Sequence, residues 1–365
     1  MSAPSPRSGI LDIQAYVGGK ADADGRTDVA KLSANESPLG PSPRAIEAYR
    51  GLAGSLHRYP DGGSVRLREA LAAFAGRSAD RIVCGAGSDE LISLLLQAYA
   101  GPGDEVIHSA HGFLMYRLSA LAVGATPVPA PETPDLMMSV DSILERVTER
   151  TRLVFLANPN NPTGTYLPSA EIRRLHAGLP EHVLLVVDAA YTEYVDAPDY
   201  DDGFALADDA ANVVVLRTFS KIMGLAALRL GWAYAPAAVA DVLNRVRGPF
   251  NVSAAAQVAG IAALADREHL AKAKAHNDRW RPWLTAELER QGFSLTPSVG
   301  NFVLVRTGSP ARATAMLRTL EAGGVLARAM GGYGLADCVR ISVGLEDENR
   351  RVVELLAAAD LDRVA

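Results

Sequence analysis

Two short, uninterrupted apolar runs, at 183–187 and 213–216, constrain the fold of this chain more than any other feature. Neither run alternates apolar with polar residues, as a strand with one solvated face would. Uninterrupted apolar strands separated by helical segments are typical of parallel sheets that are covered by helices on both faces. Residues 81–100 repeat the theme with a strand, a glycine turn and a helix. The sequence therefore predicts an α/β core around a largely parallel sheet.

The pattern changes after about residue 255. A long charged helix follows, then the strand "NFVLVRTG", another helix and the strand "CVRISVG". We therefore predict an N-terminal arm at 1–38, a large domain at 39–255 and a smaller α+β domain at 256–365, with the arm packing near the smaller domain. A chain of 365 residues has room for two such domains.

Composition narrows the class of function. The net charge of −6 and the pI near 5.7 argue against binding to nucleic acid or to an anionic membrane, since both need concentrated positive potential. The two cysteines, Cys84 and Cys338, lie far apart, so neither a disulfide framework nor a metal site is expected. The N-terminus has no apolar signal segment and no stretch is long enough to span a bilayer. We expect a cytoplasmic protein that acts on small molecules.

Polar residues follow several of the predicted strands, where loops beyond the carboxyl ends of parallel strands gather functional groups. Ser88 and Asp89, in "CGAGSDE", open a helix whose N-terminal N–H groups could bind a phosphate, although both residues are also ordinary helix caps. Asn158 begins the rigid turn "NPNNPTG", which either presents the amide or serves only as a turn. Each of these motifs alone has a structural explanation.

Asp188 ends the apolar run of "LLVVDAAY", with Tyr191 three residues beyond it. A carboxylate in that place is costly unless it is paired, so a cationic partner is expected. Lys221, in "TFSKIMGLAALRLGW", would by itself be a solvated helix lysine, but Ser220 and Arg229 are close to it in sequence. Pyridoxal 5′-phosphate explains the whole set, because its aldehyde binds a lysine, its ring nitrogen needs an acidic partner and its phosphate needs donors.

In the order of its motifs, the chain resembles the fold-type I pyridoxal-phosphate aminotransferases, and within them the histidinol-phosphate aminotransferase group. The motifs cover nearly the whole chain and include "KLSANESPLGPSP", "RYPDGG", "GSDELI", "NPNNPTG", "VVDAAY", "RTFSKIMGLAALRLGW", "PFNVS", "NFVLVR" and "VRISVGLEDEN". The resemblance implies a large cofactor-binding domain and a smaller domain. It also implies transfer of an amino group from histidinol phosphate to 2-oxoglutarate, which yields imidazole-acetol phosphate and glutamate in histidine biosynthesis.

The resemblance also implies the roles of the cofactor-binding residues. Lys221 would form the Schiff base and move the substrate's proton, while Asp188 would pair with the pyridine nitrogen. Tyr191 and Asn158 would hydrogen-bond the 3′ oxygen, and Phe113 would stack on the ring. The phosphate would be bound by Ser88, Asp89, Ser220 and Arg229, and by Tyr59 from a neighbouring subunit of a homodimer with shared sites.

Substrate recognition would depend mainly on Arg340 in "VRISVG", whose planar guanidinium suits a carboxylate or a phosphate. Arg328 resembles a second anion-binding arginine, with a surface ion pair as the other interpretation. Tyr16 resembles an arm tyrosine that closes over the substrate from the other chain. Asn158 would also face the substrate.

Two alternatives to this function stay open. The same scaffold could serve phenylalanine or tyrosine as an aromatic aminotransferase, because the chain departs from the family pattern at Ala189, Met223, Ala15 and Ala329, and apolar changes shift discrimination by about 1–3 kcal/mol each. A catalytically silent binding protein with this fold is the other alternative. The retained Lys221 and Asp188 argue against it, since a silent protein has no chemical need for them.

Overall fold

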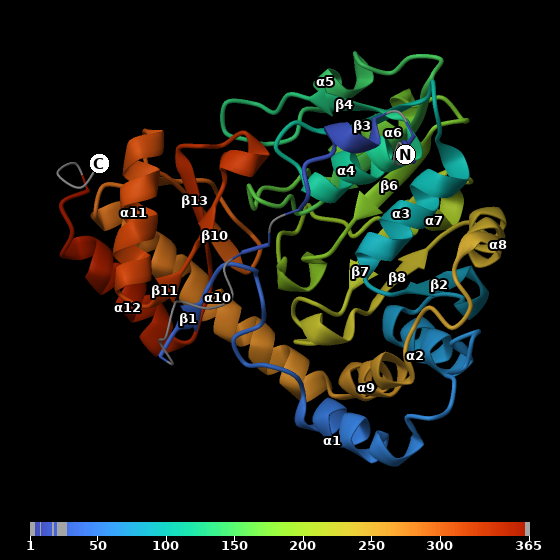
Figure 1. The fold of residues 1–365 in the computed structure, drawn as a ribbon, viewed down its shortest axis with the longest axis horizontal. Coiled ribbons are helices and arrows are strands. Elements are labelled where there is room, and N and C mark those ends of the chain that lie inside the picture. Colours follow the sequence, from blue (N-terminus) through green and yellow to red (C-terminus); the bar gives the residue numbers. More distant parts are fainter. Residues whose placement is uncertain (1–3, 8, 17, 20–27, 362–365) are drawn as a thin grey trace.

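The computed structural model describes residues 4–7, 9–16, 18–19 and 28–361. Two main sheets organise the chain (Figure 1). The large sheet has seven strands in the order β2-β8-β7-β6-β5-β3-β4. Its strands are β2 (Ile82–Gly85), β3 (Glu105–Ser109), β4 (Thr126–Ala130), β5 (Thr151–Ala157), β6 (Leu184–Asp188), β7 (Val213–Thr218) and β8 (Gly231–Tyr234). Strands β3 to β7 are mutually parallel and β8 runs antiparallel to both of its neighbours, so the predicted α/β fold with a mostly parallel sheet is confirmed.

The apolar runs are buried on both faces, as the sequence predicts. Along β6, Leu184 and Val186 pack into one hydrophobic cluster, whereas Leu185 and Val187 pack into another on the opposite face. Helices α3 (Ser88–Tyr99), α4 (Leu114–Val123) and α8 (Ala237–Val246) contribute to the first cluster. The second includes residues of α1 (Pro43–Gly51), α2 (Val65–Ala75), α5 (Val140–Leu144), α6 (Ser169–Gly178), α7 (Phe204–Asp209) and α9 (Ala254–Ala265).

A smaller antiparallel sheet lies beside the large one, in the orange and red part of Figure 1. It has four strands in the order β12-β13-β10-β9, which are β9 (Ser294–Leu295), β10 (Phe302–Arg306), β12 (Arg328–Ala329) and β13 (Cys338–Ser342). The long α10 (Arg267–Arg290) leads into this region, and α11 (Pro310–Ala322) and α12 (Glu346–Ala357) pack with it. The α+β character predicted for this part is thus observed.

The end of the N-terminal arm joins the smaller region. Strand β1 (Ala30–Lys31) pairs in parallel with β11 (Val325–Leu326), and Ala30 and Leu32 belong to the hydrophobic cluster of that region. This agrees with the expected packing of the arm, while the domain bounds 1–38, 39–255 and 256–365 stay predictions. In the described part of the chain, no helix has both the length and the hydrophobicity to cross a bilayer.

Candidate active site

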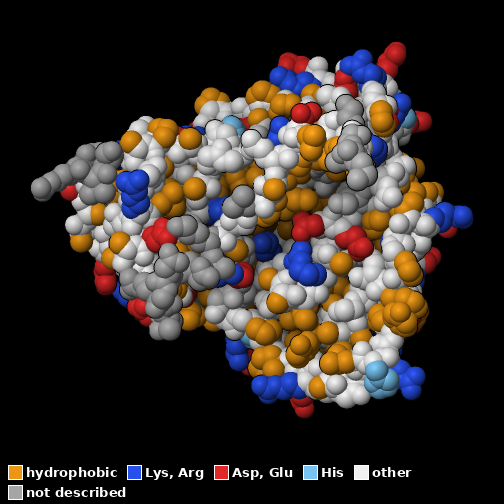
Figure 2. Space-filling model, in the orientation of Figure 1, with side chains coloured by type: hydrophobic (Ala, Val, Ile, Leu, Met, Phe, Trp, Pro, Cys, Tyr) orange, Lys and Arg blue, Asp and Glu red, His pale blue; other side chains and the backbone are white. Residues whose placement is uncertain are grey.

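A cavity of about 200 Å³ lies between the large sheet and the smaller sheet, beyond the carboxyl ends of β6 and β7. Figure 2 shows the hollow near the middle of the face, with basic and acidic side chains at its edges. Its lining includes most of the predicted site residues: Tyr16, Ser88, Asp89, Phe113, Asp188, Tyr191, Ser220, Lys221, Arg229, Arg328 and Arg340. Segments from both ends of the sequence therefore meet at one site.

Lys221 lies three residues after β7, is partly buried and lines the cavity. Its Nζ donates a hydrogen bond of 3.3 Å to the carbonyl oxygen of Ala34 and lies 5.5 Å from the ring centre of Tyr191. Burial, together with the charge of Arg340, lowers the pKa of Lys221 to about 8. About a tenth of this amine is therefore unprotonated at pH 7, far more than for an ordinary lysine, which makes it a usable nucleophile and base.

Asp188 is the last residue of β6 and is 5% exposed. Its Oδ2 accepts a 2.7 Å hydrogen bond from the hydroxyl of Tyr116, whereas its Oδ1 is buried without a hydrogen-bond partner among the described residues. Burial raises the pKa of Asp188 to about 6. A carboxylate with one unsatisfied oxygen facing a cavity fits a ligand that brings a charged N–H group.

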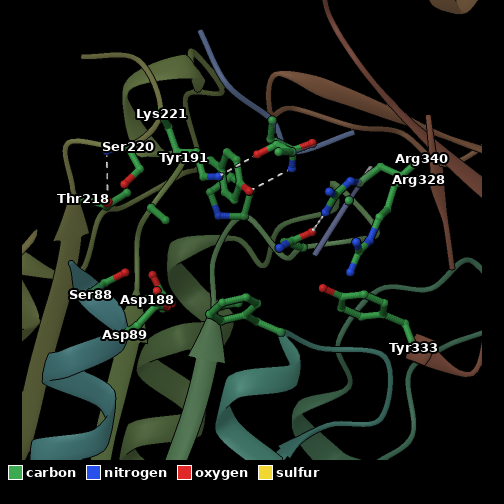
Figure 3. A pocket seen from close by; sticks show the side chains of 18 of the residues that line it. Ser88, Asp89, Asp188, Tyr191, Thr218, Ser220, Lys221, Arg328, Tyr333 and Arg340 are labelled. Atoms are coloured by element: carbon green, nitrogen blue, oxygen red, sulfur yellow. Dashed lines mark hydrogen bonds between the residues drawn. The ribbon is translucent and has the colours of Figure 1, made fainter. Parts of the chain in front are cut away.

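Arg229 lines the cavity and forms hydrogen bonds with two other residues of the lining. Its guanidinium donates to Asp89 at 2.8 Å and to the hydroxyl of Ser220 at 3.3 Å. Ser88 is the first residue of α3, so the free N–H groups of that helix end point to the same edge. Figure 3 shows Ser88, Asp89 and Ser220 at one end of the cavity and Arg328 and Arg340 at the other.

Gly87 makes room for this arrangement. Its φ of +86° lies in the left-handed region, and a Cβ atom at this position would approach Nη2 of Arg229 to 2.6 Å. Gly231 is equally constrained, because a Cβ there would lie 2.4 Å from the backbone nitrogen of Ser88. The two glycines thus keep open a cradle of donors suited to a phosphate.

Asn158 is one of two predicted site residues, with Tyr59, that do not line the cavity. Its side-chain oxygen accepts from the N–H of Leu167 at 2.7 Å and its amide nitrogen donates to the carbonyl of Leu167 at 3.2 Å. Both ends of the amide are therefore used to hold the following segment. Asn161, three residues later in the same turn, lines the cavity instead and accepts a hydrogen bond from Nη1 of Arg340.

Arg340 lies on β13 and is 5% exposed. Besides its bond to Asn161, Nη2 donates to the carbonyl of Ser33 at 3.0 Å, while Nε is buried without a partner in the described structure. Arg328 lines the cavity beside it, 5.8 Å from the ring centre of Tyr16. Tyr16 reaches this cavity from the same chain, whereas the family resemblance implied that it comes from a second chain.

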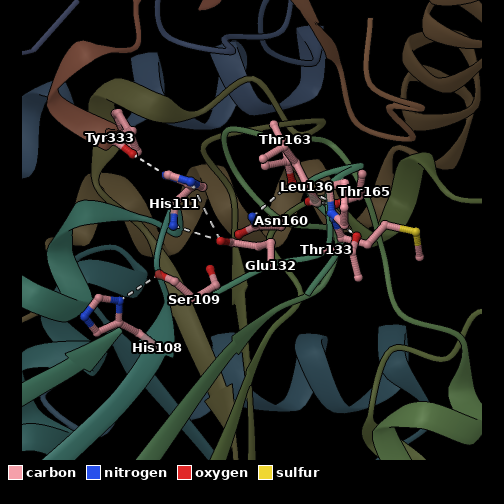
Figure 4. Close-up of polar contacts among 12 residues, drawn as sticks. His108, Ser109, His111, Glu132, Thr133, Leu136, Asn160, Thr163, Thr165 and Tyr333 are labelled. Atoms are coloured by element: carbon pink, nitrogen blue, oxygen red, sulfur yellow. Dashed lines mark hydrogen bonds and ion pairs between the residues drawn. The ribbon is translucent and has the colours of Figure 1, made fainter. Parts of the chain in front are cut away.

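Tyr333, which the sequence analysis did not single out, forms another wall of the cavity near the two arginines (Figure 3). Burial raises the pKa of its phenol to about 12, so it stays a neutral donor. Nδ1 of His111 bonds the carbonyl oxygen of Tyr333 at 2.7 Å, and the N–H of His111 donates to Glu132 at 2.8 Å (Figure 4). These contacts fix the loop of Tyr333 to the large sheet.

Two aromatic predictions have different outcomes. Phe113 lines the cavity and contacts Tyr116 edge to face, with ring centres 5.7 Å apart. Tyr59 does not reach the cavity of its own chain, since it is 83% exposed and stacks on Phe250 with ring centres 4.6 Å apart. Tyr116, missed in the sequence, lies one helical turn after Phe113, a spacing that could have signalled it.

The departures from the family pattern at Ala189 and Met223 lie outside this lining. Both side chains are buried in the hydrophobic cluster beneath the sheet. Ala15 and Ala329 line an adjoining cavity of about 430 Å³ that shares Tyr16, Arg328 and Tyr333 with the first. The substituted core positions therefore do not reshape the surface that a substrate would touch.

These residues together fit pyridoxal 5′-phosphate. The unsatisfied oxygen of Asp188 suits a protonated ring nitrogen, the cradle at Gly87 and Arg229 suits a phosphate, and the amine of Lys221 suits an aldehyde. The cofactor does not need Arg328 and Arg340, so these two guanidinium groups can bind the anionic groups of a substrate. A site with these groups can remove a proton from one carbon atom of a substrate and transfer the amino group that this atom carries.

Comparisons with known proteins agree with this chemistry. The family model described as "Aminotransferase class I and II" matches residues 27–356. A histidinol-phosphate aminotransferase of Paramagnetospirillum magneticum is 56% identical over 358 residues, which are 98% of each chain. One from Rhodospirillum centenum is 56% identical over 359 residues, with the same shares covered.

A solved structure is similar over the whole chain. It is a histidinol-phosphate aminotransferase from Sinorhizobium meliloti in complex with pyridoxal-5′-phosphate, with a TM-score of 0.90 and 31% identity. The match covers 100% of this chain and 98% of the other.

Proposed function

The chain belongs to the class I and II aminotransferases, and from that premise we propose that it transfers the amino group of histidinol phosphate to 2-oxoglutarate, giving imidazole-acetol phosphate and glutamate in histidine biosynthesis. The main observation behind the proposal is that two guanidinium groups, of Arg328 and Arg340, share one cavity with the amine of Lys221. Full-length relatives named for this activity support the choice of substrate.

When bound, pyridoxal 5′-phosphate supplies an aldehyde that takes up the donor's amino group and a ring that accepts the electron pair left on the donor's α-carbon. Asp188 would hold the ring nitrogen through its unsatisfied Oδ1. The phosphate would be held by Arg229, Ser220 and the N–H groups of the first turn of α3, at Ser88 and Asp89. Phe113 forms a wall beside the ring.

Lys221 moves the proton. Its Nζ would take a proton from the α-carbon of the amino donor as general base and deliver it, as general acid, to the cofactor carbon that holds the amino nitrogen, and its lowered pKa of about 8 suits both roles. Tyr191 would donate to the 3′ oxygen of the cofactor, and Asn161 would replace Asn158 in the role of the amide at that position, because Asn161 lines the cavity whereas Asn158 is bonded to Leu167.

Arg340 and Arg328 bind the anionic end of each substrate. Histidinol phosphate has no carboxylate, so its phosphate takes the guanidinium donors that the carboxylates of glutamate and 2-oxoglutarate use in the other half of the cycle. Tyr16 closes this end, where its ring lies 5.8 Å from the guanidinium carbon of Arg328. A substrate sealed in this way is shielded from bulk water.

The proposal includes a homodimer with shared sites. The exposure of Tyr59 and its stacked partner Phe250, and the exposed side chains of Leu56 and Val65, support an apolar surface that a second copy would cover. Tyr59 would then reach the phosphate end of the partner's cavity. A cytoplasmic location is part of the proposal, because its substrates are intracellular metabolites.

The competing function is transfer from phenylalanine or tyrosine. Mixing the cofactor-loaded protein with histidinol phosphate, and separately with phenylalanine, and following loss of the pyridoxal absorbance in a single turnover distinguishes the two. We expect much faster loss with histidinol phosphate. Faster loss with phenylalanine would replace the proposed function by an aromatic aminotransferase.

A further inference from the structure

Asn35 is a buried residue next to the catalytic machinery to which the proposed function gives no role. It follows β1, is 1% exposed and lines the cavity. Its φ of 56° places it in the left-handed region, which asparagine tolerates better than most residues. Its carbonyl oxygen accepts a 3.0 Å bond from the amide of Asn301, which fixes the backbone there.

Ser342 determines which way the Asn35 amide faces. The hydroxyl oxygen of Ser342 accepts a 2.9 Å bond from the backbone N–H of Asn35 and donates its own proton to Oδ1 of Asn35 at 3.1 Å. Since Oδ1 is used in this way, Nδ2 faces the other direction. It donates a 2.9 Å bond to the hydroxyl oxygen of Tyr191.

The direction of this hydrogen bond, from Asn35 to Tyr191, determines which further hydrogen bond the Tyr191 hydroxyl can make. Its oxygen already accepts from Asn35, so its own proton is left for an acceptor in the cavity. A phenol that accepts a hydrogen bond is also a stronger donor, because consecutive hydrogen bonds polarise one another. We propose that Asn35 is a positioning residue that commits the Tyr191 proton to the 3′ oxygen of the cofactor.

Neighbouring contacts connect the same segment to the other reactive groups. The carbonyl of Ser33 accepts from Arg340 and that of Ala34 accepts from Lys221. Ser342 lies two residues after Arg340 on β13, so one strand carries both the substrate arginine and the residue that orients Asn35. The inference rests on the proposed contact between Tyr191 and the cofactor.

A pH titration of the visible absorbance of the cofactor-loaded protein, without amino donor, tests the inference. A donor to the 3′ oxygen stabilises the deprotonated chromophore, so weakening that donor raises the pH midpoint. We expect Asn35→Ala to raise the midpoint by about 0.5–1 unit, the size of one neutral hydrogen bond. Ser342→Ala leaves the side-chain amide of Asn35 free to turn, so this variant should also raise the midpoint, but by less than Asn35→Ala does.

The double variant supplies the decisive comparison. In a Tyr191→Phe background, Asn35→Ala should produce no further shift, because the group on which Asn35 acts is gone. Asn277→Ala is the matched control, since Asn277 is also buried and hydrogen-bonded, to the carbonyl of Gly300, but does not line the cavity. It should leave the midpoint unchanged.

Two results would overturn the inference. One is an unshifted midpoint in both Asn35→Ala and Ser342→Ala, and the other is a shift of equal size with and without the Tyr191 hydroxyl. Preference for a different amino donor, which would overturn the proposed function, leaves this titration unchanged because no donor is present.

Discussion

The hydroxyl of Tyr116 holds one oxygen of Asp188 at 2.7 Å and leaves the other oxygen without a partner among the described residues. The bond lowers the pKa of a carboxyl group that burial alone would raise further. Tyr116 thus helps to keep Asp188 charged where a charged partner is needed, although Tyr116 comes from α4 and Asp188 from β6.

We therefore expect Tyr116→Phe to weaken binding of pyridoxal 5′-phosphate by about tenfold or more, the size of a hydrogen bond to a charged group. Equilibrium titration of the apoprotein with the cofactor measures the effect. Tyr166→Phe is the matched control, because Tyr166 also donates to an aspartate, Asp199, at 2.8 Å but lies outside the cavity. Equal losses in both variants would contradict the role of Tyr116.

The lowered pKa of Lys221 predicts a pH dependence. The unprotonated amine attacks an aldehyde, so the rate at which the apoprotein takes up the cofactor should rise with pH around a midpoint near 8, below the ordinary lysine value of 10.5. The charge of Arg340 contributes to this shift, so Arg340→Gln should move the midpoint upward. Stopped-flow absorbance across pH measures both, and a midpoint near 10 in the unmodified protein would contradict the burial argument.

Asn161 and Asn158 differ in role although they share one turn. Asn161→Ala should lower kcat/KM and cost less unfolding free energy than Asn158→Ala, since it removes one hydrogen bond, from Arg340, at the wall of the cavity. Asn158→Ala should cost about 1–3 kcal/mol of unfolding free energy, because it leaves both backbone groups of Leu167 unpaired. Chemical denaturation and steady-state kinetics on the two variants separate these effects. The reverse pattern would restore Asn158 as the site residue.

Arg340→Ala should weaken use of the amino donor and of the oxoacid by about 100-fold or more, far beyond any loss of cofactor affinity, since a buried guanidinium that pairs with an anion contributes about 2–5 kcal/mol. Steady-state kinetics with each substrate, together with a cofactor titration, check this. Arg306→Ala is a control on the neighbouring strand, where Arg306 bonds the carbonyl of Pro134 outside the cavity. An equal loss of cofactor binding would contradict the assignment of Arg340 to substrate.

The sheet and the family could be predicted from the sequence because both are indicated by short stretches of consecutive residues. A continuous apolar run such as 184–187 indicates a strand whose two faces are both buried. Such a strand belongs in a sheet that helices cover on both sides. The motif order predicted an aminotransferase that uses pyridoxal phosphate, and the family match and full-length relatives confirm it. Asp188 could be found because it ends an apolar strand, and Lys221 because it lies three residues beyond the end of another, at Thr218.

Other site features depend on contacts that no local pattern encodes. Three asparagines share the turn at 158–164. Asn158 pairs with Leu167 and Asn160 with Thr163, which leaves Asn161 for the cavity. Asn35 gains its orientation from Ser342, 307 positions away in the chain. Tyr59 is 83% exposed, and its proposed place at the cavity of a second copy is a contact between chains that no local pattern encodes.

The central claim is tested most directly by glutamate formation from histidinol phosphate and 2-oxoglutarate, measured with the wild-type protein and with Lys221→Ala, both supplied with pyridoxal 5′-phosphate. The account predicts sustained glutamate formation by the wild type and its loss in the variant, with the fold retained. Absence of glutamate from the wild type, or equal rates in the two proteins, would contradict it.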